Sequence, residues 1–291
     1  MDLRQIIVAT DESDAGREAV RTGLDLAERA RGQVTVMRAV TVQAIPASVG
    51  VDIGGDGFGA ETGGLELERL DRWLRADVLP APEPAKVELG IAFGVPSVEI
   101  CRFAESQAGD VLVLGRKRRS QFTRLLLGDT ADAVARRSRL PCLFVPPGSA
   151  AIRRILVALD GTDRGLAVLR TACDFARSIG ASVSIVTVEH PPKGESPELG
   201  RATPLARSAR LDERVQAIVD RECREQGKTR VGVDVRRGAV VEQVLAAVEE
   251  IRPDLLAIGY HRGGPPGVIE AGSAARHLAH SVPCAVLTVP L

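Results

Sequence analysis

Short apolar runs alternate with stretches of helical periodicity along the whole chain. In the first half, runs long enough for buried strands lie at 6–10, 34–40, 87–93, 111–114 and 142–145. Between them, apolar positions with helical spacing predict helices over 15–30, 65–78, 97–106 and 130–137, while the stretch from Thr41 to about Gly64 has the composition of a loop. The second half runs in the same order, with helices expected around 166–179, 208–226, 240–249 and 273–280. This alternation predicts an α/β fold whose parallel strands are buried on both faces.

The chain contains an internal repeat. Gln5–Ser13 (QIIVATDES) recurs 149 residues later as Arg154–Thr162 (RILVALDGT). Asp110–Gly115 recurs 144 residues later as Asp254–Gly259, and the Pro-Cys pair at 141–142 returns at 283–284. The join at 146–151, Pro-Pro-Gly-Ser-Ala-Ala, has the composition of a linker. We therefore expect two similar domains, at 1–147 and 152–291.

Each repeat predicts a doubly wound sheet, because right-handed crossovers between parallel strands place helices on both faces. In such sheets, ligands bind beyond the carboxyl ends of the strands, where the strand order reverses. Asp11 and Asp160 follow the first strand of each repeat, and Gly115 and Gly259 follow or end the fourth. We expect a ligand site near these residues in each domain.

Glycines follow the fourth strand of the second repeat in a pattern that suits a phosphate. After Gly259 the chain continues Tyr-His-Arg-Gly-Gly-Pro-Pro-Gly, and Gly272-Ser273 then begins a predicted helix. Glycine lets backbone N–H groups approach an anion without a Cβ in the way, and the first turn of a helix attracts negative charge. Ser273 is suited to cap that helix or to contact a phosphate.

The first repeat has the same frame with less favourable chemistry. Four basic residues, Arg116–Arg119, follow Gly115, and Gly128 precedes Asp129, which stands where the second repeat has Ser273. A carboxylate at that position is a good helix cap but repels a phosphate. The second repeat is therefore the better candidate for a phosphate-bearing ligand.

These residues give each half of the chain a resemblance to universal stress protein domains. Nucleotide-binding members of that family carry Gly-x2-Gly-x9-Gly-Ser/Thr after the fourth strand. The corresponding stretches here are Gly259-x2-Arg262-x9-Gly272-Ser273 and Gly115-x2-Arg118-x9-Gly128-Asp129. Arginine thus replaces the second glycine in both halves. Its guanidinium either forms a fork on a phosphate or fills the space that the phosphate needs, and at Arg118 we expect a salt bridge in place of the ligand.

The resemblance implies a fold and a ligand. It implies a five-stranded parallel sheet of order 3-2-1-4-5 in each half. It also implies ATP or a related nucleotide as the ligand, and leaves open whether Mg²⁺ binds with it. The second-half positions assigned to the nucleotide are Asp160, Val188, Gly259, Arg262, Gly272, Ser273 and Ala274. The weaker set in the first half is Asp11, Ala39, Gly115 and Gly128. In the family, the last strands of two domains pair edge to edge, which implies an intramolecular pseudo-dimer or a homodimer, with the protein partner unknown.

Composition narrows the class of partner. Lys plus Arg and Asp plus Glu both number 38, so the net charge is zero, and aromatic residues make up 3%. Nucleic-acid binding is therefore not expected, and the cluster Arg116–Arg119 fits a solvated loop or salt bridges better. No apolar run reaches the roughly 20 residues of a membrane helix, and the first residues lack a signal-peptide pattern. Five scattered cysteines without a Cys-x2-Cys pair suit reduced thiols, so we expect a cytoplasmic protein.

The residues that carry chemistry favour binding over catalysis. No Walker lysine, nucleophile elbow or Cys/His pair stands at a recognisable spacing. Asp11 and Asp160 suit a catalytic base or a helix cap, and His277 and His280 lack further ligands for a metal. We expect a regulatory ATP-binding stress protein and no enzyme, with slow ATP hydrolysis left open. The alternative is a partner-binding scaffold that does not bind nucleotide.

Overall fold

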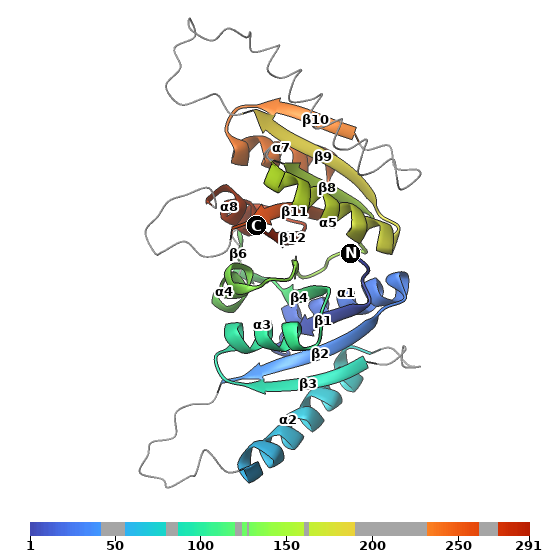
Figure 1. Ribbon diagram of the computed structural model, residues 1–291, viewed down its shortest axis with the longest axis vertical. Helices are drawn as coiled ribbons and strands as arrows, with labels where there is room; N and C mark the ends of the chain where they lie inside the picture. The colour runs from blue at the N-terminus through green and yellow to red at the C-terminus, as the bar shows by residue number, and fades with distance from the viewer. Residues whose placement is uncertain are drawn as a thin grey trace, which may run out of the picture. The chain divides into compact units, whose positions relative to one another are not determined.

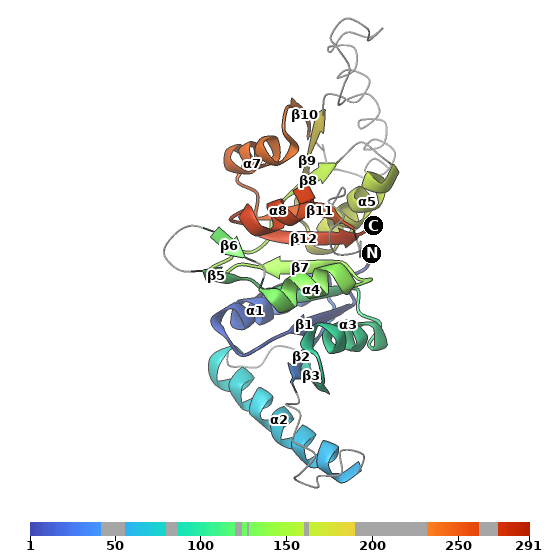
Figure 2. The ribbon, with the colours of Figure 1, turned by 90° about the vertical axis from the view of Figure 1, so that its left-hand side faces the viewer.

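The chain divides into two compact units. The computed structural model describes residues 1–41, 56–79, 87–119, 124–126, 128–159, 163–189, 232–261 and 273–291. One unit, called the first domain below, comprises Leu3–Arg118 and Leu127–Gly148. The other, the second domain, comprises Ser149–Leu291 together with Met1–Asp2 and Arg119–Leu126. Figure 1 labels most of the strands and helices of both, and β5 and β7 are labelled in Figure 2.

The first domain is built on five parallel strands. They are β1 (Gln5–Ala9), β2 (Gln33–Val40), β3 (Val87–Phe93), β4 (Val111–Gly115) and β7 (Cys142–Val145). Their order is β3-β2-β1-β4-β7, and Ile6 of β1 lies opposite both Val34 and Val111. Apolar side chains of β1, β4 and β7 are buried, as expected for a sheet covered on both faces. The predicted order 3-2-1-4-5 is confirmed for this domain.

The second domain repeats this arrangement. Its strands are β8 (Arg154–Leu159), β9 (Ser182–Glu189), β10 (Gly232–Arg237), β11 (Leu255–Tyr260) and β12 (Ala285–Pro290). They pair in parallel in the order β10-β9-β8-β11-β12. Ile155 lies opposite Val183 and Leu255, at the positions that the 149-residue and 144-residue offsets of the repeat predict. The strand order reverses between β8 and β11, as it does between β1 and β4.

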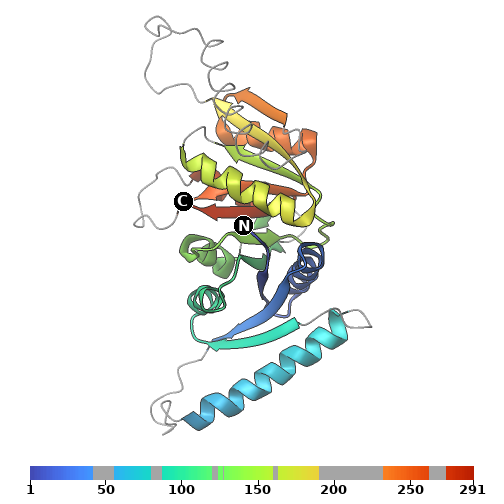
Figure 3. The same ribbon diagram turned by 45° about the vertical axis from the view of Figure 1, so that its right-hand side comes forward.

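Helices cover both faces of the first sheet. They are α1 (Asp14–Ala30), α2 (Asp56–Asp77), α3 (Pro96–Ser106) and α4 (Asp129–Arg137). α1 packs on β1 and β4, whereas α3 packs against α4 and β2. Figure 2 shows α1 and α3 on opposite sides of this sheet, and Figure 3 shows α2 alongside β3. This layering leaves the carboxyl ends of β1 and β4 open between the first turns of the helices.

The described helices of the second domain follow the same plan. They are α5 (Asp163–Ile179), α7 (Val240–Ile251) and α8 (Ser273–Ser281). α5 packs on β8 and β11, while α7 and α8 pack against each other (Figure 2). The helix predicted at 208–226 lies outside the described residues. Among the described helices, none combines the length and the apolar character needed to cross a membrane.

The loop predicted from Thr41 to about Gly64 is wrong from residue 56 onward. α2 begins at Asp56 and runs through four glycines, at 57, 59, 63 and 64. Glycine has the lowest helix propensity of any residue except proline, so the composition indicated a loop. A helix that nucleates over the apolar stretch beyond Gly64 can extend through these glycines, because adding a residue to an existing helix costs less free energy than nucleating a new helix.

The stretch after β4 also differs from expectation. Arg116 is fully buried, and its backbone N–H donates to the carbonyl of Val145 at 2.7 Å. Lys117–Arg119 form β5 and Arg124–Leu126 form β6, and these two short strands pair with each other. A solvated loop is therefore wrong for Arg116. Arg116 is buried because it lies beside β7, the last strand of the first domain. The pattern of charges along the sequence does not reveal that position.

Candidate ligand site

The first domain contains a cavity of about 450 Å³ at the carboxyl ends of β1, β2 and β4. Its apolar walls are Ala9, Ala15, Ala39, Pro96, Ile100, Leu114 and Ala131. The remaining lining residues are Thr10, Asp11, Gly16, Gly115, Gly128, Asp129 and Thr130. All four residues assigned to a nucleotide in this half, Asp11, Ala39, Gly115 and Gly128, therefore lie on one cavity.

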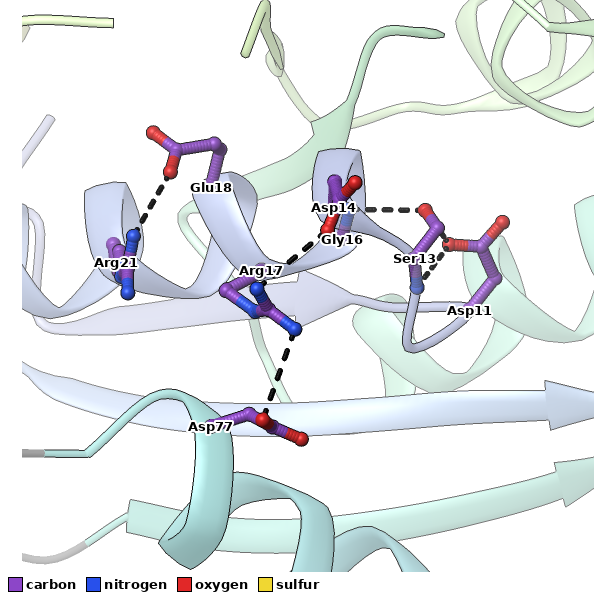
Figure 4. Close-up of polar contacts among 8 residues, drawn as sticks. All are labelled: Asp11, Ser13, Asp14, Gly16, Arg17, Glu18, Arg21 and Asp77. Carbon is purple, nitrogen blue, oxygen red and sulfur yellow. Dashed lines mark hydrogen bonds and ion pairs between the residues drawn. The ribbon is translucent and has the colours of Figure 1, made fainter. Parts of the chain in front are cut away.

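Local hydrogen bonds hold Asp11 at the cavity wall (Figure 4). Its Oδ1 accepts from the hydroxyl of Ser13 and from the backbone N–H of Ser13, the latter at 3.2 Å. Ser13 caps α1, because its Oγ accepts from the N–H of Gly16 at 3.3 Å. Asp11 thus supports the cap of α1. This agrees with one of the two roles that the sequence suggested for Asp11, a helix cap or a catalytic base. Its carboxylate is also exposed on the lining of the cavity.

Of the two glycines that the sequence predicted for this cavity, Gly115 and Gly128, only one is required by packing. A Cβ at Gly115 would lie 2.2 Å from the carbonyl oxygen of Ala15, so glycine lets the first turn of α1 approach the end of β4. A Cβ at Gly128 would meet no atom within 4 Å. Packing therefore requires glycine at 115, whereas position 128 faces open space.

Two carboxylates occupy the first turn of α4. Asp132 is buried and pairs with Arg136, whereas Asp129 is exposed and lines the cavity. Gly128 at the N-cap supplies no side-chain hydrogen bond. These two carboxylates therefore interact favourably with the positive end of the α4 dipole. Among the described lining residues, the charged side chains are the carboxylates of Asp11 and Asp129.

The turn that holds Asp11 is tied to α2. Glu12 has a φ of 60°, in the left-handed region that a residue with a side chain adopts at a cost. Its N–H donates to Oγ1 of Thr10 at 3.0 Å, and its carboxylate pairs with Arg38 at 2.8 Å and with Arg69 at 3.3 Å. Arg38 also pairs with Glu66 of α2 at 2.7 Å. These partly buried ion pairs connect the rim of the cavity to a helix at the edge of the sheet.

The second domain contains a cavity of about 240 Å³ at the carboxyl ends of β8, β9 and β11. Three residues predicted for this half, Val188, Gly259 and Ala274, line it. Other lining residues are Ala158, Leu159, Gly165, Val168, Val240, Val244, Ile258, His261, Ala275, Leu278 and Leu291. Asp160, Arg262 and Gly272 lie outside the described residues, and Ser273 is described only as the first residue of α8.

The helix beginning at this second cavity differs from its counterpart. The first turn of α8 contains no acidic residue, whereas that of α4 contains two. Gly259 is again required by packing, since a Cβ there would lie 2.6 Å from Cδ1 of Leu291 and 3.1 Å from Cγ2 of Val168. The two cavities therefore share their place in the fold, but the helices that begin beside them differ in the charge of their first turns.

The sequence analysis missed Gly16 and Gly165, although the repeat contains a signal for them. They stand 149 residues apart, the offset of Asp11 and Asp160, and each lines its cavity. A Cβ at Gly16 would lie 2.4 Å from Oγ1 of Thr10 and 3.2 Å from Oδ1 of Asp11. Glycine at this offset lets the helix start lie close to the strand end. Walls such as Ile100 and Leu114 carry no such signal, because apolar residues occur throughout the core.

Comparison with known proteins agrees with this architecture. The model of the Universal stress protein family matches residues 3–146 and, a second time, residues 151–290. The chain belongs to the universal stress protein family. The tandem arrangement of universal stress protein domains expected from the internal repeat is thereby confirmed.

Relatives of this universal stress protein cover one domain or both. A universal stress protein of Methanocaldococcus jannaschii is 27% identical over 143 residues, which is 49% of this chain and 81% of that relative. The crystal structure of a universal stress protein from Archaeoglobus fulgidus matches with a TM-score of 0.72 at 19% identity, covering 100% of this chain and 99% of that one. A structure from Pseudomonas aeruginosa matches with a TM-score of 0.63 at 14% identity, covering 99% and 93%. These two structural likenesses show the fold over the whole chain.

Two further observations on this universal stress protein concern metal binding and the thiol of Cys101. Among the described residues, no cluster of three His, Cys, Asp or Glu side chains is arranged to hold a metal ion. Burial raises the pKa of the Cys101 thiol to about 11, with Arg137 opposing and Glu105 reinforcing the rise. Cys101 is therefore a neutral thiol at physiological pH and is not a reactive thiolate.

Proposed function

We propose that this universal stress protein is a cytoplasmic regulator that binds ATP in its second domain. The observation that carries the proposal is the first turn of α8, which contains no acidic residue and begins beside a cavity at the reversal of strand order. Unpaired N–H groups and the helix dipole favour an anion at such a point. The Gly272-Ser273 pair that precedes and opens α8 matches the family's nucleotide pattern.

The proposed role is regulatory rather than catalytic. In the described part of the first cavity the polar side chains are those of Thr10, Asp11, Asp129 and Thr130. In the second cavity, His261 is the titratable side chain among the described lining residues. These groups suit recognition of a ligand. ATP would then act by binding one conformation of the protein more tightly than another.

The proposal is tested by thermal unfolding of the nucleotide-free chain with and without ATP and Mg²⁺. At a concentration 100 times the Kd, a ligand that binds only the folded state adds about 2.7 kcal/mol to the free energy of unfolding. Gly272→Asp places a carboxylate at the start of α8 and is expected to abolish the ATP-induced shift. Gly128→Asp, the matched change in the first domain, is expected to leave it in place.

Two results would contradict the proposal. If Gly128→Asp removed the shift and Gly272→Asp did not, the nucleotide would bind in the first domain. If ATP produced no shift with the unaltered chain, the alternative of a partner-binding scaffold would be favoured.

A further inference from the structure

Leu291 lies against the glycine near the end of β11 in the second domain. A Cβ at Gly259 would lie 2.6 Å from Cδ1 and 3.2 Å from Cγ of Leu291, so this side chain covers the face of Gly259 that carries no Cβ. Leu291 also lines the second cavity. It is half-buried, and its backbone N–H donates to the carbonyl oxygen of Tyr260 at 3.1 Å. The side chain is therefore packed on a residue that the family pattern assigns to the nucleotide.

The corresponding glycine of the first domain is covered differently. The three atoms nearest to a Cβ at Gly115 all belong to Ala15 of α1. Pro147 stands 144 residues before Leu291, the offset that relates Gly115 to Gly259, and is not among the described lining residues of the first cavity. The first cavity measures about 450 Å³ and the second about 240 Å³. Among the described residues, Leu291 is thus a part of the second cavity without a counterpart in the first.

Leu291 is placed where it can move. β12 ends at Pro290, whereas Val168, the other side chain next to Gly259, belongs to α5 and is 2% exposed. The second cavity, at about 240 Å³, lies below the roughly 300–1,000 Å³ of most small-molecule pockets, so a nucleotide needs more room. Displacing a half-buried residue beyond the end of a strand disturbs less close packing than displacing a core valine.

We propose that Leu291 is a displaceable plug of the second cavity, and that its side chain must leave Gly259 before ATP binds. The inference rests on the proposed function of the second domain and names the conformational change that the ligand selects. With Leu291 seated, an apolar side chain covers Gly259, and with Leu291 displaced the backbone there is open to a phosphate. The measured affinity is then the affinity of the open form multiplied by the fraction of molecules that are open.

The test is calorimetric titration of the nucleotide-stripped full chain with ATP and Mg²⁺. Leu291→Ala is expected to bind ATP about tenfold more tightly than the unaltered chain, equivalent to about 1.4 kcal/mol, because the open form no longer competes with a seated leucine. Leu291→Met keeps an apolar side chain of similar volume, so its gain is expected to stay below that of Leu291→Ala. If Leu291 were instead a wall that contacts the ligand, Leu291→Ala would bind ATP more weakly.

A matched control and a second measurement assign the effect to the plug. Ile251→Ala shortens a half-buried apolar side chain of α7 that is not among the described lining residues, and is expected to change the ATP affinity by less than about twofold. Alkylation of the thiol in Leu291→Cys, followed by mass spectrometry of the peptide, measures exposure at this position. Saturating ATP is expected to speed that alkylation.

The outcomes separate this inference from the proposed function. ATP binding by Leu291→Ala but not by the unaltered chain would support the plug and contradict ATP binding by the native protein. ATP binding by the unaltered chain with equal or weaker binding by Leu291→Ala would overturn the plug alone. An equal gain in Ile251→Ala, or alkylation that ATP slows, would also overturn it. Binding by neither chain would overturn both proposals.

Discussion

Asp110 and Asp254 stand at the start of corresponding strands and bind the start of the neighbouring strand in the same way. Oδ2 of Asp110 accepts from the N–H groups of Arg4 and Gln5, both at 2.8 Å. Oδ2 of Asp254 accepts from the N–H groups of Arg153 and Arg154 at 3.0 and 2.9 Å. Each carboxylate satisfies backbone donors where the central strand begins, and so fixes the start of that strand.

The Asp254 contact predicts a pH dependence of stability. Burial raises the pKa of this carboxyl, but hydrogen bonds from the N–H of Arg153 and from the guanidinium and N–H of Arg154 outweigh it and lower the pKa below its usual value of 3.8. Since the folded pKa is the lower one, the carboxylate stabilises the fold above its unfolded pKa. This contribution is lost as the pH falls through the folded value.

We therefore expect Asp254→Asn to reduce the free energy of unfolding by about 1–2 kcal/mol at pH 7. The difference from the unaltered chain is expected to shrink as the pH falls below about 4, where the carboxyl of the unfolded chain is protonated. Urea denaturation at several pH values measures both quantities. A difference that stays constant down to pH 2 would show that the charge of Asp254 does not contribute.

Gly115 and Gly128 form a matched pair for a second prediction. Gly115→Ala brings a Cβ within 2.2 Å of a backbone oxygen and is expected to destabilise the first domain by about 1–3 kcal/mol, the usual cost of overpacking. Gly128→Ala meets no atom and is expected to lower stability by no more than about 1 kcal/mol, because alanine is a poorer N-cap than glycine. Chemical denaturation of both variants tests the pair, and equal effects would contradict the packing assigned to Gly115.

Residue patterns predicted where the cavities lie better than they predicted why each lining residue is needed there. Asp11 and Gly115 could be named because a repeat and a strand end mark them. The packing that requires Gly115 depends on Ala15 of α1, which no local pattern connects to it. Burial of Arg116 likewise depends on a distant strand, β7, whose Val145 accepts its N–H.

At the scale of elements, α2 is held to the first domain by a narrow apolar stripe and by ion pairs. Leu70, Leu74 and Val78 are buried at a spacing of four residues, whereas Leu65 is 63% exposed. Arg17 of α1 pairs with Asp77 at 3.8 Å near the end of α2 (Figure 4). Among the described side chains of α2, the buried leucines therefore lie in its second half.

Leucine truncations in α2 test this attachment. Leu74→Ala is expected to lower the free energy of unfolding by about 2–5 kcal/mol, because it leaves a cavity at a side chain only 1% exposed. Leu65→Ala is expected to change it by less than about 0.5 kcal/mol. Denaturation of both variants measures the contrast, and hydrogen exchange of α2 amides shows whether the loss is local. A similar cost for both would contradict the burial described for the helix.

The strand pattern was easier to predict than the helix limits and the pairing register. Buried parallel strands are continuous apolar runs, so β3 and β7 fall at the predicted residues. The start of α2 was missed because glycines obscure it. The register was not accessible: Leu112 pairs with Cys142, while Leu256, its repeat counterpart, pairs with Val286 and not with Cys284.

At the scale of the whole molecule, one fold occurs twice, and the copies diverge at a helix that begins beside each cavity. Both domains keep the order 3-2-1-4-5 and a cavity at the same reversal of strand order. They differ in the charge at one helix start, with two acidic residues in α4 and none in α8. Family patterns made the fold and this contrast predictable. Edge-to-edge pairing of the last strands, expected from the family resemblance, stays a prediction.

The central claim, that only one of the two domains takes a phosphate-bearing nucleotide, has a direct test. It is the stoichiometry of ATP binding, measured by titration calorimetry of the nucleotide-stripped chain with ATP and Mg²⁺. One ATP per chain is expected. Two ATP per chain would show that Asp129 does not exclude phosphate, and no binding at several temperatures would show that the start of α8 does not attract it.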